Sequence, residues 1–340
     1  MKKLLSGLLG FALLASSGAA RADDEDADSA QNPREAAPAA TPKLAPPAKE
    51  EPPKRRVSTA SLNFFWVPYG MNYVRAAIGI GATYKAPLVQ RPGILWDTTN
   101  VTVGIRNQFG FVNNTAGVFV ELTPIAFLKL HVYAGYDVLF PGYFNGGLRI
   151  LTPLARQRLA EGRIERGNRD ALDWSDTNEA KDNRAIFEPP GLGDGLRVRA
   201  VPTLQGKIGP VGIQYNFTAD FNFYRTDGSA PDDLFHDTFT FTVKKMRDVG
   251  FGHDVTVAYS VPDIPDEILA GVTGRYYHVP SSHIDNLAVN ALFFIRPRWR
   301  FFEERLSVFG AAQVGTNLID PIYQYAFSWV LVVGADFKLF

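Results

Sequence analysis

The chain contains 340 residues with equal numbers of basic and acidic side chains, 35 of each, so its formal net charge is zero. Because there is no excess of positive charge, the composition gives no indication of nucleic-acid binding. The chain has no cysteine, which excludes disulfide bonds, thiolate metal ligands and a lipid-modified N-terminal cysteine. A chain of this length can close one large β-sheet.

The first 22 residues have the pattern of a secretory leader. Lys2 and Lys3 form a basic start, an apolar run follows from Leu4 to Leu14, and Ala20-Arg21-Ala22 is a small-x-small cleavage site. This pattern predicts a signal peptide over 1–22 that is cleaved before Asp23. The apolar run is too short to span a bilayer, and no later segment has eighteen consecutive apolar residues, so the sequence argues against spanning helices.

Residues 23–56 are dominated by Ala, Pro, Asp and Glu and contain almost no large apolar side chains. Such a segment cannot offset the entropy of ordering by burying apolar surface. We therefore expect a disordered periplasmic linker over 23–56, followed by a single folded domain over 57–340.

The clearest strand signal lies in residues 211–225, VGIQYNFTADFNFYR. Every second residue from Val211 to Phe223 is apolar, and those between are mostly polar, which predicts a strand with one apolar and one polar wall. Fifteen residues far exceed the length of an average soluble strand. They match a tilted strand that crosses a bilayer, which needs about nine to eleven residues plus extensions. Residues 196–208 alternate in the same way, and Gly209-Pro210 predicts a tight turn between the two strands.

The same alternation recurs along the domain and predicts about twelve strands. It is found in 62–66, 74–84, 101–109, 116–122, 126–138, 255–261, 268–276, 287–295, 306–314 and 329–339. An even number of strands places both chain termini in the periplasm, with short turns there and long loops outside. The predicted periplasmic turns are Thr123-Pro124, Gly209-Pro210 and residues 262–266, and the predicted extracellular loops are 140–195 and 226–251. The alternating residues 237–243 are placed in the second loop, or in an extension of a strand.

The longer predicted loop, 140–195, has a mixed character, with a helix-like piece over 154–166 and then a polar run. Loops of this size are usually functional or disordered. Three arrangements are compatible with the sequence: the loop folds into the barrel, covers its mouth, or stays mobile.

The orientation of the walls follows from where charge is absent. The apolar wall is almost free of charged residues, and aromatic residues recur near strand ends, as required of a surface in contact with lipid. The fold prediction is therefore all-β, an antiparallel transmembrane β-barrel. The alternative is a soluble lipocalin-type barrel with the apolar wall inside.

The last strand, SWVLVVGADFKLF, ends in Phe340 and resembles the C-terminal strand of Gram-negative outer-membrane β-barrel proteins. In that family the terminal aromatic residue is read by the barrel-assembly machinery and usually shares its face with apolar residues. Here the face of Phe340 carries Asp336 and Lys338 instead. The resemblance implies a location in the cell outer membrane, contact with membrane lipid and lipopolysaccharide, and assembly by that machinery.

The polar wall, if it faces the barrel axis, supplies the candidate lumen-lining residues. Nine are basic and five are acidic, with one histidine besides: Arg75, Arg106, Lys129, Arg197, Arg199, Lys207, Arg275, Arg305 and Lys338; Glu121, Asp137, Asp220, Asp254 and Asp336; and His131. A basic lumen favours passage of anionic solutes. Small barrels are also filled by their own side chains, so an open and a plugged lumen both fit the sequence.

Candidate catalytic residues are gathered in three places: residues 278–285 (HVPSSHID), His236-Asp237 and His253-Asp254. Ser, His and Asp are the residue types of nucleophilic hydrolysis. The His-x-Ser-Asn-Gly motif of outer-membrane phospholipases is absent, and two histidines without a carboxylate at fixed spacing do not predict a metal site. We therefore expect no enzyme activity, metal or cofactor.

The favoured hypothesis is a porin-like passive channel for small polar, and possibly anionic, solutes. A plugged structural or adhesion barrel and a surface hydrolase that uses the rim residues are the alternatives.

Overall fold

The structure is a computed structural model that describes residues 56–69, 73–89, 98–141, 147–160, 186–237, 240, 242–262, 266–297, 305–320, 322 and 327–338. The predicted signal peptide over 1–22 and all but the last residue of the predicted linker over 23–56 lie outside these residues.

Twelve antiparallel strands form a closed barrel in which each strand pairs with its neighbours around the ring. They are β1 (Val57–Tyr69), β2 (Tyr73–Pro87), β3 (Asn100–Gly110), β4 (Asn113–Ile125), β5 (Leu128–Leu139), β6 (Gly193–Ile208), β7 (Val211–Thr226), β10 (Arg247–Ser260), β11 (Glu267–Val279), β12 (Ile284–Arg296), β13 (Leu306–Ile319) and β14 (Phe327–Lys338). The predicted strand number and antiparallel architecture are confirmed.

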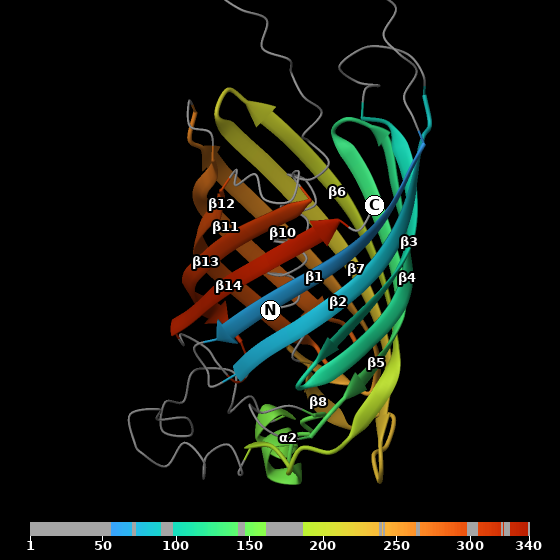
Figure 1. Ribbon diagram of the computed structural model, residues 1–340. Coiled ribbons are helices and arrows are strands. Elements are labelled where there is room, and N and C mark those ends of the chain that lie inside the picture. The colour runs from blue at the N-terminus through green and yellow to red at the C-terminus, as the bar shows by residue number, and fades with distance from the viewer. Residues whose placement is uncertain are drawn as a thin grey trace, which may run out of the picture.

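The barrel closes where the first strand meets the last. β1 and β14 pair from Ser61 with Lys338 to Tyr69 with Val330, and Figure 1 shows them side by side. Closure removes the unpaired strand edges that an open sheet would expose. Every barrel strand therefore has a hydrogen-bonded partner on both sides, which is what a backbone inside a bilayer requires.

The apolar wall faces outward. Ile80 and Ile105 are 62% and 60% exposed, whereas the polar Asp220 and Asn222 are fully buried on the inner wall. Large apolar side chains are exposed in the same way on most barrel strands. An apolar surface of this extent is not found facing water on a monomeric soluble protein, so lipid must cover it. The lipocalin-type alternative, with the apolar wall inside, is wrong.

One predicted turn is displaced. β4 continues through Thr123 and Pro124 to Ile125, so Ala126 and Phe127 make the turn to β5. The pairing between β4 and β5 shifts register between Leu122 and Ile125. Such a bulge accommodates Pro124, which has no backbone N–H to donate to the neighbouring strand. The turn at Gly209-Pro210 lies where it was predicted, with Gly209 at φ 57°.

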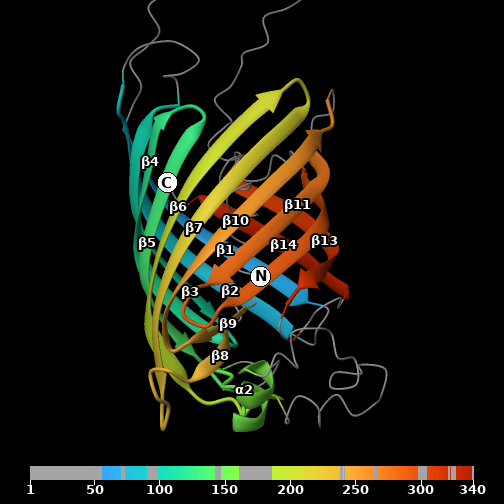
Figure 2. The ribbon, with the colours of Figure 1, turned by 180° about the vertical axis from the view of Figure 1, so that it is seen from behind.

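The two ends of the barrel differ. The turns at Ala126-Phe127 and Gly209-Pro210 lie at one end, here called the short-turn end, where β1 starts and β14 stops. The connections between β5 and β6 and between β7 and β10 lie at the other, the lid end. Figures 1 and 2 show the β6–β7 turn and α2 (Pro153–Ala160) at opposite ends of the molecule.

The two long connections form a folded lid, defined here as residues 147–160, 186–191 and 231–246. Within it, β8 (Leu234–Asp237) and β9 (Thr242–Lys245) make a separate two-stranded hairpin, so the alternating residues 237–243 add no strand to the barrel. Backbone hydrogen bonds join the two connections, from Leu151 N to Leu234 O at 2.8 Å and from His236 N to Arg149 O at 2.9 Å. The predicted helix is α2, and its expected continuation to residue 166 lies outside the described residues.

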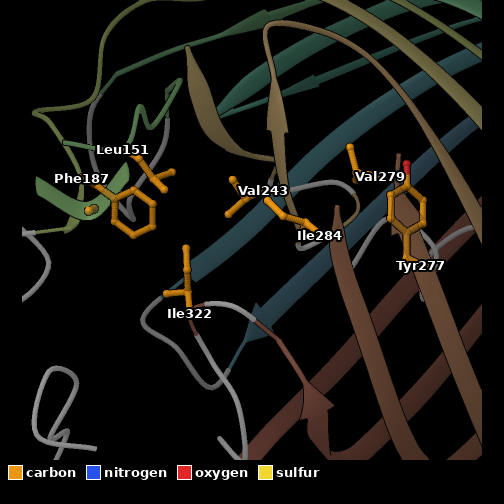
Figure 3. Close-up of a cluster of buried hydrophobic side chains, with 8 residues drawn as sticks. Leu151, Phe187, Val243, Tyr277, Val279, Ile284 and Ile322 are labelled. Atoms are coloured by element: carbon orange, nitrogen blue, oxygen red, sulfur yellow. The ribbon is translucent and has the colours of Figure 1, made fainter. Parts of the chain in front are cut away.

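Two apolar clusters fix the lid to the barrel. The first contains Leu151, Ala155, Phe187, Val243, Tyr277, Val279, Ile284 and Ile322, and Figure 3 shows that lid and barrel-wall residues both contribute to it. The second contains Leu139, Leu148, Ile150, Tyr224, Phe235 and Met246. Each large apolar side chain buried in this way stabilises the docked lid by about 1.5–3 kcal/mol. Among the described helices, none combines the length and apolar character needed to cross a bilayer.

Candidate functional site: the lumen and its lid

An ionic network joins the lid to the inner wall of the barrel. Lys244 of β9 places Nζ 2.7 Å from Asp220 Oδ2 on β7 and 3.1 Å from Asp237 Oδ2 on β8. Arg197 Nη2 on β6 lies 3.1 Å from Asp237 Oδ1, and Arg199 Nη2 lies 3.1 Å from Asp220 Oδ1. These five side chains, here called the ionic latch, are all at most 8% exposed. Lid and wall therefore neutralise each other's charges.

The charge on Lys244 is stabilised by its surroundings. Burial by itself would lower the pKa of Lys244, but the carboxylates of Asp220 and Asp237 more than reverse this effect, so its pKa is raised above the ordinary value. The ammonium also lies 4.9 Å from the centre of the Tyr277 ring, in a cation–π contact. Lys244 therefore remains a cation in the docked lid at every physiological pH.

The ionic latch extends to Asp137, and with it these buried charged groups have no net charge. Asp137 on β5 accepts a hydrogen bond from the Tyr224 hydroxyl and lies 3.8 Å from Arg197 Nε. With Asp137 included, three cations face three carboxylates in this part of the lumen. Removing one member of such a buried set leaves an uncompensated charge, which is far more costly than removing both partners.

The lid also contacts β11, two strands along the ring from β7. Arg275 Nη2 on β11 donates to the backbone oxygen of Thr240, at the tip of the lid hairpin, at 3.1 Å. The same nitrogen lies 3.3 Å from Asn286 Oδ1 on β12. On β7, Asn222 Nδ2 donates to the backbone oxygens of Lys245 and Met246 at 3.1 Å each. The hairpin is thus held by polar contacts from β6, β7 and β11.

A second group of paired charges lies on β4 and β5. Lys129 Nζ is 2.7 Å from Glu121 Oε2, and His131 Nδ1 is 3.6 Å from the same oxygen. Nearby, the guanidinium of Arg106 lies 4.3 Å from the centre of the Tyr133 ring. That ring occupies the space over Gly135, where an added Cβ would lie 1.9 Å from the Tyr133 hydroxyl oxygen. Glycine at this position allows the aromatic ring to lie flat against the wall.

The structure places most of the predicted lumen-lining residues on the inward-facing side of their strands. Those with buried side chains are Glu121, Lys129, Asp137, Arg197, Arg199, Asp220, Asp254 and Arg275. Those with partly buried side chains are Arg106, His131 and Asp336. Arg75 lies in β2 and Lys338 in β14, and their side chains are outside the described part of the chain.

Two predicted lumen-lining residues lie at the rim of the barrel. Lys207 is exposed near the end of β6, and Arg305 is exposed in the turn before β13. Both lie at the short-turn end of the barrel, where side chains reach solvent. A place in the lumen remains a prediction for both.

Sequence reasoning missed the charges that the lid brings into the lumen, above all Lys244, and the ion pair between Arg296 and Glu267 at 3.4 Å. Among the described residues, the buried charged side chains are five basic (Lys129, Arg197, Arg199, Lys244 and Arg275) and seven acidic (Glu121, Asp137, Asp220, Asp237, Asp248, Asp254 and Asp320). The expected basic excess is not found in this set. The alternating residues 237–243, which Lys244 and Lys245 follow, indicated a strand in this connection. Nothing in the sequence indicated that this strand folds into the lumen.

The candidate catalytic pairs are separated by the strands that carry them. His253 and Asp254 lie within β10, and neighbouring strand residues point to opposite faces. His253 is therefore on the outer wall, with Nδ1 2.8 Å from the Tyr215 hydroxyl, while Asp254 is on the inner wall. His236 is buried in the lid against Phe187, with ring centres 5.8 Å apart. Neither histidine lies at an accessible rim.

Residues 278–285 do not assemble a nucleophile with its base. His278 Nδ1 lies 2.8 Å from Asp285 Oδ1, but Ser281 donates its hydroxyl hydrogen bond to Asp248, at 2.7 Å. Among the described contacts, no hydrogen bond joins Ser281 or Ser282 to a histidine. The described part of the chain also contains no group of three or more His, Cys, Asp or Glu residues placed to hold a metal ion.

A closed antiparallel barrel with a lipid-facing apolar exterior and a charged, hydrogen-bonded interior defines an outer-membrane β-barrel protein of porin-like architecture. Its location is the cell outer membrane, where lipid and lipopolysaccharide surround it. No protein-family model matches the sequence, and no curated protein sequence is significantly similar to it.

Several solved structures resemble the chain at low sequence identity. One is the KdgM porin in complex with disordered oligogalacturonate (7% identity, TM-score 0.35, covering 82% of this chain and 99% of that one). Another is the NanC porin (8% identity, TM-score 0.35, covering 82% of this chain and 100% of that one). A third is the β domain of the Bordetella autotransporter BrkA (6% identity, TM-score 0.37, covering 83% of this chain and 98% of that one). At TM-scores below 0.5, these similarities do not extend to function.

Proposed function

We propose that this protein is a gated, porin-like channel of the outer membrane, in which the lid closes one end of the lumen and its release admits small polar solutes. The observation that carries this proposal is the ionic latch. It joins the lid hairpin to the wall through side chains alone, with Lys244 between Asp220 and Asp237 and with Arg197 against Asp237.

The latch suits a reversible gate because its charged groups are stable in either position. When the lid leaves, Arg197 and Asp220 face the water that enters the lumen, and Lys244 and Asp237 face water outside. Each ion then exchanges a paired partner for hydration, and these two terms nearly balance for buried ion pairs. The apolar clusters favour closure, so the docked lid is the resting state.

The balance of charge in the lumen gives no support to strong selectivity for anions. Four of its described cations, Lys129, Arg197, Arg199 and Lys244, are paired with carboxylates. Arg106 lies against the Tyr133 ring, and Arg275 contacts the neutral oxygens of Thr240 and Asn286. A paired cation attracts a passing anion much less than a free one does. We therefore propose small polar solutes as the cargo, without a general preference for negative charge.

Conductance in planar bilayers tests the gate. In the variant, residues 234–245 are removed and Asp233 is joined to Met246 by two glycines, a short connection because Met246 N already donates to Asp233 O at 3.1 Å. We expect the intact protein to be mostly closed and the variant to show a steady open conductance. An Arg225→Met control removes an ion pair with Asp194 on the outer wall, 2.7 Å between Nε and Oδ1, and should behave as the intact protein does.

The proposal fails if the shortened variant retains the β-sheet circular dichroism of a folded barrel but passes no current. A permanently plugged structural or adhesion barrel would then be the better description. That second candidate is favoured by the two apolar clusters, which hold the lid in addition to its ion pairs.

The route to the membrane is part of the same proposal. We propose that residues 1–22 act as a cleaved signal peptide, that 23–56 form a periplasmic linker, and that the short-turn end of the barrel, where β1 starts and β14 stops, faces the periplasm. Recognition of the last strand by the barrel-assembly machinery remains a prediction, and Phe340 lies outside the described residues. Protease digestion of intact cells would test the orientation, because only an extracellular lid would be accessible.

A further inference from the structure

One histidine lies on the lipid-facing wall far from either rim of the barrel. His253 is in the middle of β10, and its outward-facing neighbours on that strand are apolar in both directions: Val249 and Phe251 toward the lid end, Val255 and Val257 toward the short-turn end. Val255 and Val257 are 45% and 43% exposed, so lipid covers this part of the strand. His253 is therefore placed in the hydrocarbon region of the membrane.

The other acidic and basic side chains that alternation places on the outer wall of the described strands all lie at strand ends. Each is within the first two or last two residues of its strand: Asp194, Arg225, Arg247, His278 and Asp285. At a strand end a side chain can reach the head groups or water, but at mid-strand it cannot. Because an ionisable group at membrane depth is costly, His253 marks a place where the wall makes a specific contact.

The imidazole of His253 uses only one of its nitrogens within the described part of the protein. Nδ1 lies 2.8 Å from the hydroxyl oxygen of Tyr215 on β7. The ring centre lies 5.3 Å from that of Phe217 and 6.1 Å from that of Tyr276 on β11. No contact of the described residues engages Nε2, and Nε2 is not among the polar atoms that the protein encloses. This nitrogen is thus open to the lipid side without a partner.

The pair formed by Tyr215 and His253 presents one donor and one acceptor, whichever tautomer the histidine adopts. If the Tyr215 hydroxyl donates to Nδ1, then Nε2 carries a proton and the hydroxyl oxygen keeps a lone pair. If Nδ1 donates to the hydroxyl oxygen, then Nε2 is an acceptor and the hydroxyl proton is free. Acyl chains satisfy neither group, and an unpaired polar group in hydrocarbon is costly. An identical pair, by contrast, supplies the acceptor for the donor and the donor for the acceptor.

Beside this pair the wall leaves room for close approach. Gly274 faces outward on β11, in register with Val255, and a Cβ added to it would have no atom within 4 Å. Small residues of this kind let membrane-embedded elements come close together. Figure 2 shows β7, β10 and β11 side by side, so these residues belong to one continuous face. This face is here called the outer patch, and it consists of Tyr215, Phe217, His253, Gly274 and Tyr276.

We infer that the outer patch is a membrane-embedded interface between two copies of this chain, an inference that goes beyond the proposed channel function and does not depend on the gate. The His253 and Tyr215 pair of each copy forms hydrogen bonds with the same pair of the other copy. The rings of Phe217 and Tyr276 surround these bonds, and the space over Gly274 receives an apolar side chain of the second copy. The self-complementary pair is the reason to assign a second copy of the chain, since lipid offers neither a donor nor an acceptor at this depth.

Single-molecule photobleaching in lipid vesicles tests the inference, because the number of bleaching steps gives the number of copies in a complex. The chain has no cysteine, so Asp227→Cys, in the exposed turn after β7, provides one site for a fluorophore. We expect the labelled full-length protein to bleach mostly in two steps. His253→Phe replaces the imidazole by an apolar ring that lipid solvates, so the barrel should stay folded. The dissociation constant of the dimer should rise about tenfold, because each copy loses one hydrogen bond.

Two further variants and two controls separate the interface from local structure. Tyr215→Phe removes only the hydroxyl and should weaken the dimer to a similar extent. Gly274→Leu fills the open space, which a single copy tolerates, and should give one-step bleaching. Asn107→Leu and Ala82→Leu are the controls, because both residues are exposed on the outward face of β3 and β2, on the opposite side of the ring. Both controls should keep two-step bleaching.

A protein that bleaches in one step at every protein-to-lipid ratio overturns the inference. Dimers that persist unchanged in all three patch variants, with the β-sheet circular dichroism of a folded barrel, overturn it as well. Dimers that the patch variants dissociate and the controls preserve support it. None of these results bears on the gate, which is tested separately by the conductance of the variant that lacks residues 234–245.

Discussion

The two halves of the lumen share the same alternating strand pattern but differ in the inward-facing residues of β7 and its neighbours. At the lid end, inward-facing residues are charged and paired with groups on the lid, as Asp220 is with Lys244 at 2.7 Å. Toward the short-turn end, β7 and its neighbours carry Gln214, Thr256 and Thr273, which are uncharged and linked to one another or to the wall. On β7 and its neighbours, charge is thus concentrated where the lid is held, and uncharged hydrogen-bonding groups lie toward the short-turn end. The Lys129–Glu121 pair on β4 and β5 carries charge at that end of the barrel.

The largest effect is expected from Lys244→Met, which leaves Asp220 and Asp237 without their shared cation. Breaking a buried ion pair from one side costs about 3–5 kcal/mol, so the lid should undock and the open probability in planar bilayers should rise steeply. Lys245→Met is the matched control, because Lys245 pairs with the exposed Asp232 at 3.5 Å and such pairs contribute at most about 1 kcal/mol. Equal open probabilities for the two variants would show that the ionic latch does not hold the lid closed.

Phe235→Ala tests the apolar contribution to the same closure. Phe235 is 1% exposed in the second apolar cluster and meets the Tyr224 ring edge-on at 5.5 Å. Truncation of a buried phenylalanine costs about 3–4 kcal/mol, less where the surroundings relax. We expect limited proteolysis to cleave the lid much faster while barrel strands stay protected. Unchanged protection of the lid would show that polar contacts alone hold it.

Acidification should loosen the lid through His236. Burial lowers the pKa of His236 to about 3 in the docked lid, and the positive charge of Arg149 adds to this effect. Below about pH 6.5 the released lid binds a proton that the docked lid does not, so docking weakens as pH falls toward the lowered pKa. The loss is at most about 1.4 kcal/mol per pH unit. Open probability measured from pH 7.5 to 5 should rise, and His236→Gln should flatten this rise; a profile unaffected by the substitution would contradict the assignment.

The smallest effect on closure is expected from a change at Gln214, on the inner wall of β7 toward the short-turn end. Gln214→Leu in the full-length protein removes a hydrogen bond to Asn216 Oδ1 but touches no lid residue among the described contacts. Distant sites without shared partners contribute additively, so lid proteolysis should change by less than about 0.5 kcal/mol in apparent docking energy. A large change would mean that Gln214 and the lid are energetically coupled, although they lie in different halves of the lumen.

The fold was accessible from the sequence because one local rule repeats along the domain. In a strand such as β7, Val211 to Phe223 place apolar groups on one side and Gln214 to Asn222 polar groups on the other. The orientation of the walls also followed, since the outward face contains almost no charge. The rule failed at one turn: Pro124 lies within β4, at a shift in register between β4 and β5, and does not form the predicted turn.

The candidate site was only partly accessible. The wall residues of the latch, such as Arg197 and Asp220, were predicted to face the lumen from alternation. Their partners were not, because Lys244 and Asp237 lie in a connection with no period that distinguishes inward from outward folding.

The sequence by itself determined that the chain forms a barrel and which wall meets lipid, because a two-residue period acts between adjacent residues and needs no knowledge of distant ones. Only the tertiary structure decided that the two long connections fold into the lumen as a lid, and which charges form ion pairs there. Those outcomes depend on contacts between residues far apart in the chain, such as Asp220 with Lys244 and Arg197 with Asp237. Coulombic and apolar contacts of that kind form only once the barrel has brought the strands together.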